Sequence, residues 1–228
     1  MLEYTHSGGE IINNYSESTV KWILASPIII IALGWTTATL FSQWVGAWAW
    51  VPVALVYWGS CAWFIWKYRS GKQLAEWLRP SGRKAKRAIF LCILFGLIPM
   101  SILAMNLNLL TSPLLVVLWL LFALVNPWFE ELYWRGLLLD RLAGHWPNWL
   151  SAIYSAVLFT LSHPLMWGVF SIANRNMEVY VFLLAAGLVW SYAYFKMKSL
   201  RWNIFSHFLV DIGNLAVFVF LNLYIPGP

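Results

Sequence analysis

Long apolar segments, repeated along the whole sequence, limit what this chain can fold into more than any other feature. A helix needs about 20 apolar residues to cross a hydrocarbon layer of about 30 Å. Seven segments approach that length, at about 20–41, 46–66, 88–107, 113–134, 149–167, 179–195 and 203–224. They predict an all-α, polytopic transmembrane helical bundle of about seven spans, several of them broken at prolines.

The composition agrees with lipid as the solvent of this chain. Of its 228 residues, 61% are hydrophobic and only 11% are charged, whereas soluble domains average about 45–50% and about 25%. The 17 Trp and 10 Tyr suit the boundary between lipid and water, where amphipathic rings gather. A soluble domain is therefore excluded as the main architecture.

The net charge of +6 first suggests a nucleic-acid partner, but its distribution does not. Eight of the fifteen basic residues lie between Lys67 and Arg87, in one loop between two apolar segments. Such a loop usually marks the cytoplasmic side and lies beside anionic lipid. We therefore expect anionic lipid at loop 67–87, no nucleic acid, a cytoplasmic N-terminus and an external C-terminus.

The termini and cysteines add little chemistry. The first twenty residues are polar and slightly acidic, so no cleavable signal peptide is expected. Cys61 and Cys92 both fall inside apolar segments without metal-ligand spacing, and we interpret them as buried hydrophobic residues.

Six ionisable residues inside the apolar segments need a specific explanation. Each costs at least about 2.5–3.5 kcal/mol on insertion scales, and such residues usually mark function. They lie on three segments and are Glu130, Glu131, Arg135, His163, His207 and Asp211.

The first group lies in NPWFEELYWRG, residues 126–136. Pro127 suits the first turn of a helix and Asn126 suits its N-cap, so we expect a break or kink there. Glu131 and Arg135 then share a face at i, i+4 and can form an ion pair. Glu130 is turned about 100° away and has no such partner, which suits a general base in a cavity. A purely structural ion-pair cluster explains these residues equally well.

The two histidine motifs also have a catalytic and a structural interpretation. Phe159 and His163 are i, i+4, so the phenyl ring can shield the imidazole. His207 and Asp211 have the same spacing, and the carboxylate could orient the ring. Polar contacts between helices remain the alternative for both pairs.

Taken together, the three motifs resemble those of a known family. The patterns EE-x-x-x-R, F-x-x-x-H and H-x-x-x-D follow one another on successive apolar segments, with Gly136 after the arginine. They are similar to the CPBP family of intramembrane glutamic proteases, which includes CAAX prenyl proteases and bacteriocin-processing and self-immunity proteins. The resemblance covers roughly 118–221.

The resemblance implies hydrolysis of a peptide bond by activated water. Glu130 would be the general base, and His163 would hold and polarise the water. His207 and Asp211 would stabilise the oxyanion. The supporting residues would be Glu131, Arg135 and Phe159.

The resemblance also indicates where the catalytic core lies in the chain and what class of substrate it acts on. We expect a cytoplasmic tail at 1–19, additional spans at 20–112 and the catalytic core at 113–228. The substrate would be a membrane-associated or lipidated protein or peptide in a bacterial or archaeal plasma membrane. The family implies no metal or cofactor, although two histidines and a glutamate could instead bind zinc with an open fourth position.

Two further points remain open in the sequence. The family motif often ends in Asn where this chain has Asp211, and an ionised Asp cannot donate to an oxyanion. Either burial keeps Asp211 protonated or, as we favour, it orients His207. His163 also lies deep in its segment, whereas Glu130 and His207 lie near the inner ends of theirs.

Two other functions compete with proteolysis. In a non-catalytic scaffold or immunity factor, the same polar cavity would bind a partner and the motifs would be structural. A proton-coupled transporter would also use intramembrane Glu and His, but the sequence shows no inverted repeat.

Overall fold

The computed structural model describes residues 17–82 and 85–225, and within these ranges the chain forms helices and no β-strand. This confirms the predicted all-α fold. The chain begins with an antiparallel hairpin of two long helices, α1 (Glu17–Val45) and α2 (Trp50–Tyr68), joined by the short turn η1 (Gly46–Ala49).

The remaining elements follow the hairpin in chain order. They are α3 (Gln73–Trp77), α4 (Lys86–Leu97), α5 (Met100–Met105), η3 (Leu107–Leu109), α6 (Pro113–Glu130), the π-helical turn η4 (Glu131–Leu137), α7 (Leu138–Leu142), α8 (Asn148–Leu165), η5 (Trp167–Val169), η6 (Ala173–Arg175), α9 (Met177–Met197), α10 (Arg201–Gly213) and α11 (Ala216–Phe220).

Five helical segments of the described chain are long and apolar enough to cross a membrane: Ser18–Tyr68, Lys86–Met105, Pro113–Leu142, Asn148–Val169 and Met177–Met197. The first of these contains both arms of the α1–α2 hairpin. The predicted seventh span, 203–224, is instead divided into α10 and α11, because Leu215 between them takes a left-handed backbone conformation with φ of 56°.

Of the predicted proline breaks, those at Pro127 and Pro164 are wrong, whereas the third predicted span is interrupted at Ile98–Pro99, between α4 and α5. Pro27, Pro127 and Pro164 all lie inside helices, α1, α6 and α8 respectively. Irregular backbone also lies at the π-helical turn η4 and at the junction of α10 and α11. Proline removes one backbone donor, and in these helices that loss does not end the element.

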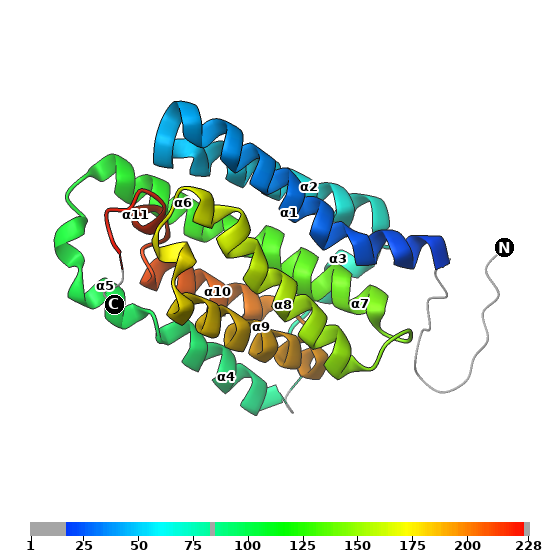
Figure 1. The fold of residues 1–228 in the computed structure, drawn as a ribbon. Coiled ribbons are helices and arrows are strands. Elements are labelled where there is room, and N and C mark those ends of the chain that lie inside the picture. Colours follow the sequence, from blue (N-terminus) through cyan, green and yellow to red (C-terminus); the bar gives the residue numbers. More distant parts are fainter. Residues whose placement is uncertain (1–16, 83–84, 226–228) are drawn as a thin grey trace.

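Helix α10 lies in the middle of the bundle and carries two of the motif residues. It packs against α4, α6 and α9, while α8 packs against α9. Figure 1 shows the α1–α2 hairpin along one side of the bundle and α4 on the opposite side. Two of the motif-bearing segments, α6 and α10, are therefore direct neighbours.

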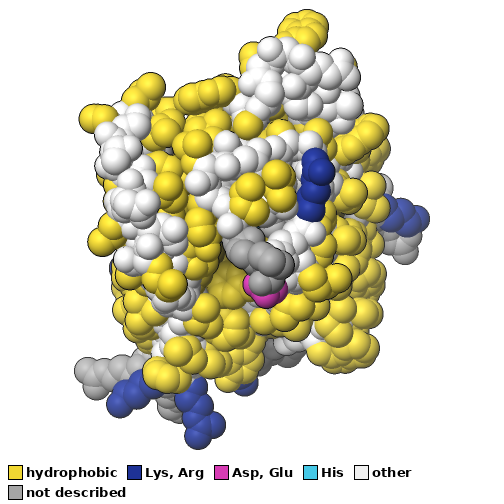
Figure 2. All heavy atoms as spheres, turned by 60° about the vertical axis from the view of Figure 1, so that its left-hand side comes forward, with side chains coloured by type: hydrophobic (Ala, Val, Ile, Leu, Met, Phe, Trp, Pro, Cys, Tyr) yellow, Lys and Arg dark blue, Asp and Glu magenta, His cyan; other side chains and the backbone are white. Residues whose placement is uncertain are grey.

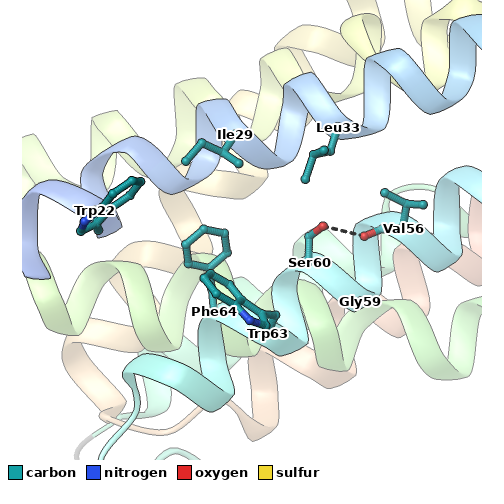
Figure 3. Close-up of a pocket in the computed structure, with 8 residues that line it drawn as sticks. All are labelled: Trp22, Ile29, Leu33, Val56, Gly59, Ser60, Trp63 and Phe64. Carbon is teal, nitrogen blue, oxygen red and sulfur yellow. Dashed lines mark hydrogen bonds between the residues drawn. The ribbon is translucent and has the colours of Figure 1, made fainter.

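The outer surface fits a hydrocarbon environment. Hydrophobic side chains cover most of the face in Figure 2, and basic side chains are few on it. A hollow of about 510 Å³ lies between α1 and α2, with the apolar side chains of Trp22, Leu33 and Trp63 among its lining (Figure 3). No residue of the three motifs lines this hollow.

The basic loop packs against the C-terminal parts of α7 and α9. Asp140 accepts hydrogen bonds from Trp77 Nε1 at 2.7 Å, Tyr194 Oη at 2.6 Å and Gln73 Nε2 at 3.2 Å. A Cβ on Gly136 would lie 3.1 Å from the Trp77 ring, so this glycine allows the loop to pack closely. Residues 83–84 of the loop and 1–16 of the predicted tail 1–19 lie outside the described residues.

Candidate active site

Asn126 and Pro127 lie inside α6, so the predicted N-cap and break at this point are wrong. The helix continues regularly to Glu130 and widens into the π-helical turn from Glu131 to Leu137. Asn126 makes side-chain contacts instead of capping a helix. Its amide donates to Glu130 Oε2 at 3.3 Å and to Asp211 Oδ2 at 3.1 Å.

The expected Glu131–Arg135 ion pair is present and fully buried. Arg135 Nη1 donates to Glu131 Oε1 at 2.9 Å, and both side chains have zero exposure. The guanidinium also lies 4.3 Å from the centroid of the Phe159 ring and 5.0 Å from that of Trp190. Desolvated cation–π contacts of this kind are among the stronger ones, so Arg135 joins three elements.

His207 lies between the two adjacent glutamates. Its Nδ1 is 2.9 Å from Glu131 Oε1, and its Nε2 is 3.1 Å from Glu130 Oε2. The imidazole stacks on Trp190 with ring centroids 4.6 Å apart. The sequence left Glu130 without a partner, but the structure gives it one from α10.

The predicted hydrogen bond by which Asp211 would orient His207 is absent. Asp211 Oδ1 lies 3.8 Å from His207 Nε2, which is beyond hydrogen-bonding distance. The two ring nitrogens face Glu131 and Glu130 instead. The orientation of His207 therefore comes mainly from the glutamate pair.

His163 has a partner that sets the position of its ring proton. Its Nδ1 lies 3.0 Å from the carbonyl oxygen of Phe159, an atom that only accepts. The proton of the neutral ring is thus on Nδ1, and Nε2 is an acceptor. The expected packing is also present, because the rings of Phe159 and His163 have centroids 5.0 Å apart.

Counting residues along the helices does not by itself place the motif residues at one depth. The apolar helical segment continues from Pro113 to Leu142, so Glu130 lies about 18 Å from its C-terminal end at a rise of about 1.5 Å per residue. The same rise places His207 about 9 Å from Arg201 and His163 about 22 Å from Asn148. The difference between His163 and His207 that the sequence predicted is still present along the helices, although both side chains line one cavity.

One small cavity brings the predicted catalytic residues together. It has a volume of about 50 Å³. Its lining residues are Phe122, Asn126, Glu130, His163, Trp167, Asn174, His207, Asp211, Asn214, Ala216, Val219 and Phe220. All four residues predicted as catalytic belong to this lining, whereas Glu131, Arg135 and Phe159 pack behind it.

Sequence reasoning missed several residues that complete the site. Asn203 Nδ2 donates to Glu131 Oε2 at 3.4 Å, and Trp190 covers the His207 ring. Asn126 and Asn203 each lie four residues before a motif residue, so helical spacing could have indicated both. Trp190 and its stacking depend on how α9 packs, which no spacing in the sequence reveals.

No group of three metal-ligating side chains suited to an ion occurs among residues 17–82 and 85–225. The carboxylates and imidazole of the site contact one another directly.

Comparison with known proteins gives one family match, which covers the C-terminal part of the chain. Residues 112–213 match the family model described as type II CAAX prenyl endopeptidase Rce1-like. Neither the curated proteins nor the solved structures gave a match to the chain. The matched segment contains all three motifs, and the family supports an intramembrane endopeptidase of the CAAX protease type. The chain is thus an integral membrane protein in which residues 112–213 match the Rce1-like type II CAAX prenyl endopeptidase family.

Proposed function

We propose that this chain hydrolyses peptide bonds in membrane-associated or lipidated proteins or peptides, with Glu130 as the general base of a glutamic-type mechanism. The observation that carries the proposal is the shared lining of one small buried cavity by Glu130, His163, His207 and Asp211. A general base must come within hydrogen-bonding reach of the proton that it removes, and a shared cavity supports that requirement.

The cavity suits one or two water molecules. Its volume of about 50 Å³ compares with about 30 Å³ per molecule in the liquid. A water there could donate one hydrogen bond to the Glu130 carboxylate and the other to His163 Nε2, the acceptor nitrogen of that ring. Both acceptors then orient the oxygen lone pairs toward a substrate carbonyl.

In the first step, Glu130 takes a proton as the water oxygen bonds to the carbonyl carbon. The carbonyl π electrons move to oxygen and form the oxyanion. The carbon–nitrogen bond then breaks, and the leaving amine takes the proton from Glu130. The products are one carboxylic acid and one amine, so the water is fully accounted for.

His207 is suited to stabilise the oxyanion. Each of its two short nitrogen–carboxylate contacts requires one proton between the atoms, so ionised Glu130 and Glu131 imply a cationic ring. Its Nε2–H is directed to Glu130 Oε2 in the same cavity, and a developing oxyanion there could accept this hydrogen bond once Glu130 has taken the water proton. Asp211, at 3.8 Å from the same nitrogen, adds a carboxylate that favours this cation.

The test compares the termini of membrane proteins in cells that express the native chain or Glu130→Gln at equal, verified levels. Loss of a general base typically costs 10²–10⁴-fold in rate, so termini produced by the native chain should vanish. His163→Ala should give the same result. Full activity in either variant would refute the mechanism.

Glu178→Gln is the matched control. It makes the same chemical change at an exposed glutamate at the start of α9, outside the cavity. The membrane-protein termini found in cells that express Glu178→Gln should match those found with the native chain. Equal detergent extraction and equal unfolding temperatures for all variants show that loss of cleavage is not loss of folded protein.

One observation favours a second function, a non-catalytic scaffold or immunity factor. Both nitrogens of His207 already face glutamates of the same chain, as in a structural contact between helices. On that hypothesis Glu130→Gln leaves the phenotype intact, and the native and variant termini are identical. Glu131→Ala or Arg135→Ala would then still destabilise the fold.

A further inference from the structure

Asn126 connects the candidate base to a second carboxylate of the cavity. It lies on α6 one turn before Glu130 and is only 4% exposed. Its Nδ2 donates to Glu130 Oε2 at 3.3 Å and to Asp211 Oδ2 at 3.1 Å. A single primary amide has two hydrogens, and here each of them faces a different carboxylate.

The orientation of this amide is determined by Trp58. The indole Nε1 of Trp58 donates to Asn126 Oδ1 at 2.9 Å. An indole nitrogen can only donate, so this contact selects the oxygen of the amide and directs its NH₂ group toward the carboxylates. Trp58 itself is held by Phe129, on which it stacks with centroids 5.8 Å apart and an interplanar angle of 15°.

The two carboxylates need such a donor because they share one small buried cavity. Two like charges in a poorly solvated space repel each other, and buried ionised groups are costly without hydrogen bonds. Asp211 cannot satisfy Glu130 itself, since an ionised carboxylate only accepts. An amide between the two groups satisfies both and fixes their separation.

We propose that Asn126, oriented by Trp58, is a positioning residue that holds Glu130 and Asp211 in the geometry that hydrolysis requires. The inference rests on the proposed function for its catalytic meaning. The amide bridge itself is a structural statement that can be tested without activity.

The test is a cycle of four proteins: native, Asn126→Ala, Asp211→Asn and the double variant. Asn126→Ala removes the donor and leaves two facing carboxylates. Asp211→Asn in that background removes one charge and adds a new amide beside the space vacated by residue 126. The double variant should therefore have a higher kcat than Asn126→Ala alone. In the native background, by contrast, Asp211→Asn should not raise kcat.

Turnover is measured on an internally quenched, farnesylated CAAX peptide in detergent micelles. Asn126→Ala should lower kcat at least about tenfold, equivalent to about 1.4 kcal/mol, with KM unchanged. The double variant should recover at least half of that loss on a logarithmic scale. Trp58→Phe keeps the ring but removes its donor, and should also lower kcat with little change in KM. The inference would be overturned if Asn126→Ala kept the native kcat. It would also be overturned if the kcat of the double variant were no higher than that of Asn126→Ala.

Thermal unfolding of the same four proteins separates this inference from the proposed function. Coupling between positions 126 and 211 should appear as non-additive shifts of the unfolding temperature. If the native chain cleaves neither the peptide nor membrane proteins, proteolysis is refuted and the unfolding cycle alone decides the bridge. Additive shifts would then show that Asn126 and Asp211 do not act together.

Discussion

Arg135→Met is the substitution whose effect can be worked out most fully from the structure. It replaces a buried cation by an uncharged chain of similar length. Breaking a buried ion pair by removing one partner typically costs about 3–5 kcal/mol, and the lost contact over Phe159 adds about 1–2 kcal/mol. The expected destabilisation of about 4–7 kcal/mol approaches the whole stability of many proteins.

The matched comparison is the double variant Glu131→Gln/Arg135→Met, which removes both charges. Because no uncompensated carboxylate remains, it should be more stable than Arg135→Met alone. Glu131→Gln should also be destabilising, since it leaves the buried Arg135 cation without its carboxylate. Each variant is unfolded thermally in the same detergent, with tryptophan fluorescence as the signal. The importance of this pair would be refuted if Arg135→Met were as stable as the native chain. It would also be refuted if the double variant were less stable than Arg135→Met.

Two further predictions concern packing and the basic loop. A Cβ at Gly213 would lie 2.6 Å from the backbone carbon of Pro99 and 2.7 Å from the nitrogen of Met100, so Gly213→Ala should lower the unfolding temperature clearly. Gly59→Ala, where a Cβ meets open space, should not, and equal temperatures for the two would contradict this packing. Asp140→Ala leaves three donors without their acceptor, at about 1–3 kcal/mol each where they stay buried. Trypsin should then cut after Lys72 faster than in the native chain, and an unchanged rate would contradict the loop docking.

The features that sequence predicted well are those that depend on local spacing. The Glu131–Arg135 pair and the Phe159–His163 contact both join residues four apart, and both are present. The all-α membrane fold follows from the length and polarity of the apolar segments, which are also local properties. These predictions required no knowledge of how the helices are arranged.

The predictions that failed depend on tertiary packing. Proline at 127 suggested a helix start, but α6 continues through it, and both Asn126 and Pro127 are buried against neighbouring helices. The partner of His207 was predicted as Asp211 from i, i+4 spacing, whereas Glu130 and Glu131 from another segment lie closer. Helical spacing shows which residues share a face, but it does not show which helix that face meets.

The partners of Glu131 differ greatly in their distance along the chain, and this has a consequence for biosynthesis. Arg135 is four residues away, whereas His207 is 76 residues away. At about 5–20 residues per second, about 4–15 s separate the synthesis of Glu131, at the start of η4, from that of its partner His207. During that interval the nascent helix can neutralise one of its two glutamates with its own arginine. Glu130 has Asn126 one turn before it, but its partner His207 is made only with α10, so the last motif to leave the ribosome completes the environment of the first.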